Sequence, residues 1–150
     1  MPDTPEALAH NPAASVLGFD YGTRLIGVAV GNRLSGSRAL TTVNNGAEPD
    51  WRRVDALIGE WRPACLVVGL PLGMEGDEQP MSRAAREFAR ALEQRYGVPV
   101  ELADERLTSI EASRRFAAQR AAGTARRKHA AAIDAIAAEV ILENWLAEHA

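Results

Sequence analysis

The stretch SVLGFDYGTRLIGVAVG, residues 15–31, decides the fold of this chain. It holds two apolar runs of strand length, residues 15–20 and 25–31, and the segment that joins them contains Asp20 and Gly22, which favour a turn. This pattern predicts a β-hairpin. A third β-rich run over residues 38–43 would complete an antiparallel meander of three strands.

The rest of the chain alternates between helical and strand patterns. Asp50 can cap a helix that Pro63 stops, and Gly97 stands where a second helix would end. The expected elements are a helix over 50–61, a strand over 64–70, a helix over 82–96, a strand over 98–103 and helices over 108–122 and 125–147. This order predicts an α/β fold with a mixed five-stranded sheet, three antiparallel strands plus two parallel ones, with helices on both faces.

The composition is that of one domain. The chain has 150 residues, 47% of them hydrophobic and 25% charged, and a domain of this size buries roughly 70% of its surface without a metal or disulfide. Residues 1–14 are rich in proline and lack a sustained period, so we expect a flexible N-terminal tail and then one domain over residues 15–150. Cys65 is the sole cysteine, which excludes an internal disulfide and fits a reduced, cytoplasmic setting. No stretch reaches the roughly 18 apolar residues of a membrane span.

The charge is distributed unevenly. The formal net charge of -3 argues against a protein that coats nucleic acid without preference. Residues 106–129 nevertheless carry seven basic side chains and one acid, a local charge of +6. Cations near the start of the last helix oppose its dipole, so a phosphate-binding role is one interpretation and a solvated basic turn is the other. The candidates for contact with nucleic acid are Arg106, Arg126, Arg127 and Lys128.

Two acidic segments end predicted strands. Asp20 closes the first strand, where the alternative is a turn-forming aspartate, and Asp104 and Glu105 close the last one. Adjacent residues of an extended chain point to opposite sides, so one of this pair faces the sheet edge, and we favour Glu105. Thr108 and Glu111 have the spacing of a capping box, which assigns Glu111 to the start of the next helix.

A third acid, Asp134, lies among alanines beside the core-facing stripe of the last helix. A carboxylate there costs desolvation energy unless it is paired, bound to a cation or turned to solvent. With Asp20 and Glu105 it would form a catalytic site of three carboxylates without histidine or cysteine, which suits magnesium or manganese. Such a site can hold two ions that activate water against a phosphodiester. Candidates for a supporting role flank these acids: Gly22, Thr23, Asp104 and Thr108.

Four motifs, taken in order along the chain, are similar to those of one family. They are FDYGTRLIGVAV at 19–30, VVGLPL at 67–72, DERLTSIEA at 104–112 and IDAIAA at 133–138, and the likeness spans about residues 16–146. The chain resembles the YqgF family, a bacterial group of RNase H-like proteins described both as Holliday junction resolvases and as pre-16S rRNA nucleases.

This resemblance has implications for fold, activity and site. It implies an RNase H-like fold and a magnesium-dependent hydrolase that acts in the cytoplasm at the 5′ end of the 16S rRNA precursor, with ribosomal precursor particles as further partners. It also implies that Asp20, Glu105 and Asp134 are the catalytic metal ligands. Lys128 or Arg127 would be the basic residue that precedes the last acid in this family.

Other functions stay open. Residues 20–23 followed by Gly27 also resemble the phosphate loop of actin-like kinases, but that fold needs two lobes and this chain has room for one. A nucleic-acid-binding protein without activity is a second alternative. A junction resolvase acting on branched DNA is a third, and its paired cuts need a symmetric dimer. No long apolar stripe marks a dimer interface, so we expect a monomer or weak homodimer. The family resemblance favours RNA processing over junction cleavage.

Two features near the expected site have open roles. Tyr21 or Phe116 could stack on a base of single-stranded RNA. Residues 72–80 form a loop long enough to act as a flap over a substrate, and an ordinary surface connection is the alternative.

Overall fold

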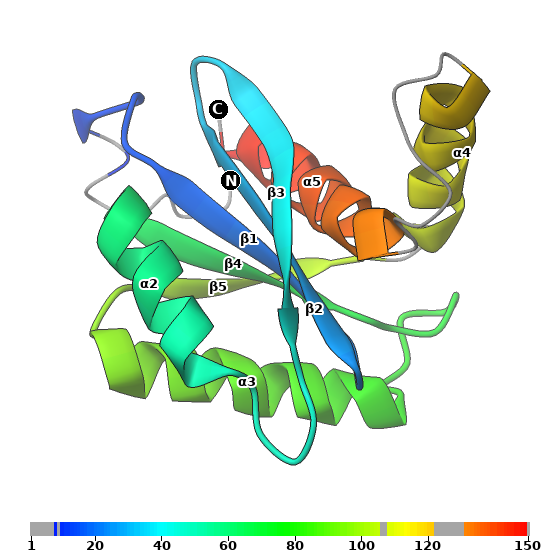
Figure 1. Cartoon of the computed structure of the whole chain (residues 1–150), viewed down its shortest axis with the longest axis horizontal. Helices are drawn as coiled ribbons and strands as arrows, with labels where there is room; N and C mark the ends of the chain where they lie inside the picture. Colours follow the sequence, from blue (N-terminus) through cyan, green and yellow to red (C-terminus); the bar gives the residue numbers. More distant parts are fainter. Residues whose placement is uncertain (1–7, 9, 106–107, 122–130, 150) are drawn as a thin grey trace.

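A five-stranded sheet forms the centre of the chain, and the computed structural model describes residues 8, 10–105, 108–121 and 131–149. The strands are β1 (Val16–Tyr21), β2 (Leu25–Asn32), β3 (Gly36–Asn44), β4 (Cys65–Leu70) and β5 (Val100–Asp104). Their order across the sheet is β3-β2-β1-β4-β5 (Figure 1). The pairs β1 with β2 and β2 with β3 are antiparallel, whereas β1 with β4 and β4 with β5 are parallel. The predicted mixed sheet is therefore confirmed.

The parallel strands β1, β4 and β5 end at the same edge of the sheet. Phe19 pairs with Val68, and Leu70 pairs with Asp104, so the carboxyl ends of β1 and β5 flank that of β4. Asp20 therefore lies at the edge where the chain leaves β5. Ligands of open α/β sheets bind beyond the carboxyl ends of the strands, which makes this edge the place to look for a site.

Helices cover both faces of the sheet. They are α2 (Trp51–Trp61), α3 (Pro80–Tyr96), α4 (Thr108–Ala121) and α5 (Ala131–Glu148). α2 and α3 pack on one face, α5 packs on the other, and α4 lies against α5 away from the sheet (Figure 1). One buried cluster fills each face, around Phe19 and Phe88 on the α3 side and around Val67 and Trp145 on the α5 side. None of the described helices is long and apolar enough to cross a membrane.

The helix ends follow local sequence. The side chain of Asp50 accepts a hydrogen bond from the backbone N–H of Arg53 at 3.3 Å, which caps α2 as expected. α3 begins at Pro80, two residues before the predicted start, because proline suits the first position of a helix. It ends at Gly97, which has a φ of 64°. Of the last predicted helix, residues 125–130 lie outside the described residues.

The N-terminal segment differs from the predicted flexible tail over residues 1–14. Leu8 is fully buried in the cluster that contains Trp145 and Leu146. A guanidinium N–H of Arg33 donates to the carbonyl oxygen of Leu8 at 2.8 Å, and the backbone N–H of Arg33 donates to that of Pro12 at 3.1 Å. Leu8 is thus anchored on the α5 face, whereas the side chains of residues 10–13 are exposed, and residues 1–7 and 9 lie outside the described residues.

Cys65 is expected to resist thiol reagents for as long as the protein stays folded. Its side chain is fully buried at the start of β4, and burial, with the negative charge of Glu101, raises the pKa of the thiol to about 12. The thiolate, which is the reactive form, is therefore scarce at pH 8. Labelling with an aromatic disulfide reagent should need denaturant to proceed. Rapid labelling of the native protein would contradict this expectation.

Candidate active site

Asp20 and Glu105 meet at the carboxyl edge of the sheet. Their side chains are hydrogen-bonded to each other. Glu105 directly follows β5, and its backbone N–H donates to the carbonyl oxygen of Leu70 at 3.2 Å, which holds the residue against the end of β4. Gly69 leaves room for the carboxyl group, because a Cβ at this position would stand 2.9 Å from Oε2 of Glu105.

Asp134 approaches the same edge from the first turn of α5. Gly27 pairs with Asp20 across the hairpin, and a Cβ on Gly27 would stand 1.9 Å from the backbone oxygen of Asp134. The helix backbone thus lies directly on the strand, in space that only glycine leaves free. The approach is close enough for the charge of Asp134 to raise the pKa of Asp20.

The three carboxyl groups titrate above their ordinary range. Burial is the largest cause for each and raises the pKa of Asp20, Glu105 and Asp134. The charge of Asp20 further raises the pKa of Glu105. Their mutual hydrogen bond lowers the pKa of Asp20 and raises that of Glu105, so the pair keeps one proton to a higher pH than isolated carboxyl groups do. Two carboxyl groups with pKa values pushed apart at a strand edge are a candidate site on physical grounds.

The donor set fits a hard divalent cation. All three acids offer carboxylate oxygens, which are the ligands that magnesium and manganese prefer. In the described part of the chain, however, no three acidic, histidine or cysteine side chains stand close enough to form a ready-made ion site. The half-buried pair of Asp20 and Glu105 still fits a cation, because a positive charge could replace the proton that they share. Asp134 adds negative charge beside that pair.

The four residues predicted to support the acids lie at different points around the site. A Cβ on Gly22 would stand 2.5 Å from the backbone oxygen of Leu25, so Gly22 serves the tight turn between β1 and β2. Thr23 is exposed in that turn. Asp104 is exposed at the end of β5, and its charge contributes to the raised pKa of Glu105. Thr108 is the first residue of α4.

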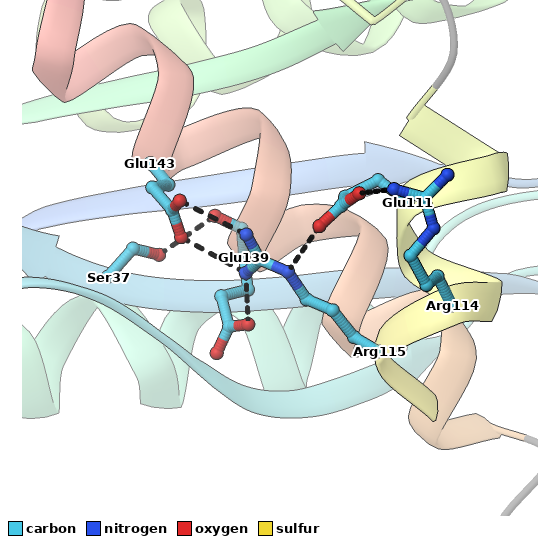
Figure 2. Close-up of polar contacts among 6 residues, drawn as sticks. All are labelled: Ser37, Glu111, Arg114, Arg115, Glu139 and Glu143. Carbon is cyan, nitrogen blue, oxygen red and sulfur yellow. Dashed lines mark hydrogen bonds and ion pairs between the residues drawn. The ribbon is translucent and has the colours of Figure 1, made fainter. Parts of the chain in front are cut away.

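The predicted contacts to nucleic acid fall outside the described residues; they are Arg106, Arg126, Arg127 and Lys128. Another arginine of the basic segment, Arg115 of α4, is engaged by acids. Its guanidinium contacts three carboxylates at N–O distances of 3.1, 2.8 and 3.0 Å, and these belong to Glu111, Glu139 and Glu143 (Figure 2). Arg115 therefore ties α4 to α5.

The two candidate stacking aromatics are both partly buried. The ring of Tyr21 packs on Phe88 with the centroids 5.0 Å apart, on the α3 side of the sheet. Phe116 packs against a small cluster formed by Ala112, Ile136 and Ala137 between α4 and α5. Both rings thus contribute to packing.

The loop over residues 72–80 has hydrogen bonds of its own. Leu72 and Glu78 form an antiparallel bridge, and the backbone N–H of Gly73 donates to the carbonyl oxygen of Asp77 at 2.8 Å. Ser82 of α3 bonds to the carbonyl oxygen of Pro71. The loop is therefore a folded turn anchored to α3 beside the end of β4.

Two glycines prove essential to the geometry of the acids, although the motifs do not single them out for that reason. Gly27 lies in the interior of β2 and Gly69 near the end of β4. A glycine inside an apolar strand signals that another part of the chain approaches closely. That signal is visible in the sequence, but it does not say which segment approaches.

Comparisons with known proteins agree on one family. The model of the RuvX family, described as "Holliday junction resolvase", matches residues 14–148. A protein of Xanthomonas campestris pv. campestris (strain B100), named "Putative pre-16S rRNA nuclease", is 54% identical over 144 residues, which cover 95% of this chain and 93% of that protein. A protein of Xanthomonas axonopodis pv. citri (strain 306) with the same name is 52% identical over 145 residues, covering 95% and 94%.

A solved structure shares the architecture. The structure titled "T. thermophilus RuvC in complex with Holliday junction substrate" superposes with a TM-score of 0.52 and 19% identity, covering 91% of this chain and 95% of the other. At this identity the likeness shows the fold alone, which is RNase H-like. The family model spans nearly the whole chain and the relatives match at more than half of the aligned positions. This chain therefore belongs to the RuvX family, which is the YqgF family that its motifs resemble.

Proposed function

We propose that this chain is a metal-dependent nuclease that hydrolyses phosphodiester bonds at the 5′ end of the 16S rRNA precursor. The observation that carries the proposal is the half-buried, hydrogen-bonded pair of Asp20 and Glu105, with Asp134 beside it, at the carboxyl edge of the sheet. The family description supports nuclease chemistry, and the names of relatives more than 50% identical support the RNA substrate. Its setting is then the cytoplasm, with precursor RNA or ribosomal precursor particles as partners.

In the proposed mechanism Asp20, Glu105 and Asp134 would hold two magnesium or manganese ions. Asp20 is the central acid of this set, because it bonds to Glu105 and lies beside Asp134. A divalent cation supplies positive charge that activates water and neutralises the leaving oxygen of the phosphodiester. The pair of Asp20 and Glu105 would have to give up its proton to hold a cation, so binding of the cation should become easier as the pH rises. Arg106 and Lys128 hold the flanking phosphates.

The test compares two substrates side by side. Purified protein is incubated with a 5′-extended 16S precursor RNA and with a four-way DNA junction, each with magnesium or manganese, and Asp20→Asn serves as the blank. Cleavage of the RNA alone, absent from the blank, is the expected result. Paired cuts in the junction would favour the resolvase activity that the family description names.

Two further outcomes identify the other candidates. RNA binding that persists in Asp20→Asn, without cleavage under either metal, would indicate a binding protein that lacks activity. Thermal stabilisation by ATP but not by manganese would indicate a kinase-like protein. The described residues form one sheet, which leaves no second lobe to enclose a nucleotide.

A further inference from the structure

α5 packs against two glycines of the sheet, one beside Asp134 and one beside Ala138 and Leu142. Besides the contact at Gly27, a Cβ on Gly18 would stand 2.9 Å from Cβ of Leu142 and 3.4 Å from the backbone oxygen of Ala138. The buried positions in the first half of α5 include Ala135, Ala137 and Ala138. Helices normally keep their place through side chains that interlock with a neighbouring surface. Small residues meet around Asp134 and Ala138, whereas the larger buried side chains Ile141, Leu142 and Trp145 interlock further along α5. Side-chain packing therefore holds the first turns of α5 less firmly than the later ones.

Glu139 attaches this helix to the edge strand β3. Its Oε2 accepts a hydrogen bond from the backbone N–H of Ala39 at 3.0 Å, and its backbone oxygen accepts one from Oγ of Ser37 at 3.1 Å (Figure 2 shows the Ser37 bond). Its Oε1 accepts a bond from Arg115 at 2.8 Å. The carboxylate side chain is only 17% exposed, so these charge-assisted bonds are shielded from water.

Strand β3 has an irregular pairing with β2 close to the residue that the Glu139 carboxylate contacts. The register between β2 and β3 shifts beside Val28 and Ala29, where Ala29 pairs with Ala39 and Val28 pairs with Thr41. An extra residue in one strand leaves ladder groups without their usual partner. Glu139 supplies an acceptor to Ala39 at this place, and therefore fixes α5 at one position along the sheet.

We infer that Glu139 is a positioning residue, which sets where Asp134 stands relative to Asp20. Asp134 and Glu139 are five residues apart on α5, which is about 7.5 Å along the axis of a rigid helix. A shift of the helix at Glu139 therefore also moves Asp134. The inference rests on the proposed function only for its catalytic consequence. The attachment itself can be measured without any substrate.

Glu143 offers a matched control on the same helix. It lies one turn after Glu139 and shares the partner Arg115, at 3.0 and 3.1 Å. Its side chain is 48% exposed, and the bonds described for it run to Arg115 alone within the described residues. Glu143→Ala therefore removes a carboxylate from the same ion-pair network without touching β3.

The experiment uses Glu139→Ala, Glu139→Gln and Glu143→Ala in the full chain. In Glu139→Ala, amide hydrogen exchange over residues 133–138 should be at least about tenfold faster, with residues 141–146 unchanged. The kcat for RNA cleavage should fall between about tenfold and a hundredfold, with KM within about threefold, because ligands displaced by an ångström lose that much. Glu139→Gln keeps an oxygen for Ala39 and should stay within about threefold of wild type in both measurements, as should Glu143→Ala.

Contrary results are equally specific. Equal acceleration of exchange in Glu139→Ala and Glu143→Ala, or no acceleration in either, would overturn the inference. So would a loss of kcat in Glu139→Ala no larger than that in Glu143→Ala. If the wild-type protein cleaves neither RNA nor junction, the proposed function fails while the exchange comparison still decides whether Glu139 holds α5 in place.

Discussion

Replacing Asp20 by asparagine is expected to abolish cleavage, lowering the rate by roughly a thousandfold or more. Asparagine keeps the size of the side chain and one acceptor oxygen but removes the negative charge that would hold a divalent cation. Stabilisation of the phosphodiester transition state by such a cation is worth several kcal/mol, and each 1.36 kcal/mol corresponds to tenfold in rate. Initial rates on end-labelled precursor RNA, over a range of magnesium concentrations, measure the effect. Excess magnesium should not rescue the variant.

The same variant should be more stable than the wild type at pH 8 when metal is removed, which shows that its inactivity does not come from unfolding. Burial raises the folded-state pKa of Asp20 and Glu105 above the ordinary range near 4. As the pH rises through that range the unfolded chain loses these protons first, so the folded state of the wild type loses stability until its own groups ionise. Asparagine carries no such proton.

Thermal melts in a chelator between pH 5 and pH 9 provide the measurement. The difference between Asp20→Asn and wild type should grow with pH over this range and become independent of pH below about pH 3, where Asp20 and Glu105 are protonated in both the folded and the unfolded wild type. A variant that melts below the wild type at pH 8 would make Asp20 a structural residue, and the loss of cleavage would then need another explanation.

Gly27→Ala is expected to destabilise the protein by about 3 kcal/mol and to reduce cleavage with it. The added Cβ would stand 1.9 Å from the backbone oxygen of Asp134 and 2.4 Å from its carbonyl carbon. Both are backbone atoms, so no change of rotamer relieves the clash. α5 must lift from β2, which moves Asp134 away from Asp20 and opens the apolar cluster beneath the helix. Urea denaturation and the rate of RNA cleavage measure the two effects.

Gly59 provides the matched control for this substitution. It lies exposed in α2, and a Cβ there would meet nothing within 4 Å. Gly59→Ala adds the same single methyl group and should stabilise the helix by up to about 1 kcal/mol, because alanine is the better helix former. Cleavage should be unchanged. Equal losses from both alanines, or wild-type stability in Gly27→Ala, would contradict the close contact between α5 and β2.

The sequence predicts this fold well where the causes are local. Apolar runs placed β4 to within one residue, and the proline at position 80 accounts for a two-residue error at the start of α3. The parallel strand order also predicts that Asp20 and Glu105 share a sheet edge, because that follows from topology without side-chain detail. The docked Leu8 escapes prediction, since the apolar site that buries it exists only after α5 has packed.

In the candidate site, too, the sequence predicts what depends on local pattern and misses what depends on tertiary contacts. That the two acids share a proton depends on how deeply they are buried, which no local pattern gives. Arg115 lies in a basic run and resembles a phosphate ligand, yet its partners Glu139 and Glu143 are 24 and 28 residues away and meet it only in the folded chain. Gly27 signals a close approach, but the identity of Asp134 as the approaching residue is a fact of tertiary structure.

The way in which α4 is attached makes it less stably held than the sheet and the other helices. The sheet with α2, α3 and α5 buries two large apolar clusters, whereas the side chains of α4 that the structure describes share a small one, whose buried members are Ala112, Ile136 and Ala137. Part of its attachment to α5 is electrostatic and passes through Arg115, whose pair with the 48% exposed Glu143 is open to screening by salt, unlike its pair with Glu139. Rising ionic strength is therefore expected to loosen α4 before the sheet that carries Asp20 unfolds.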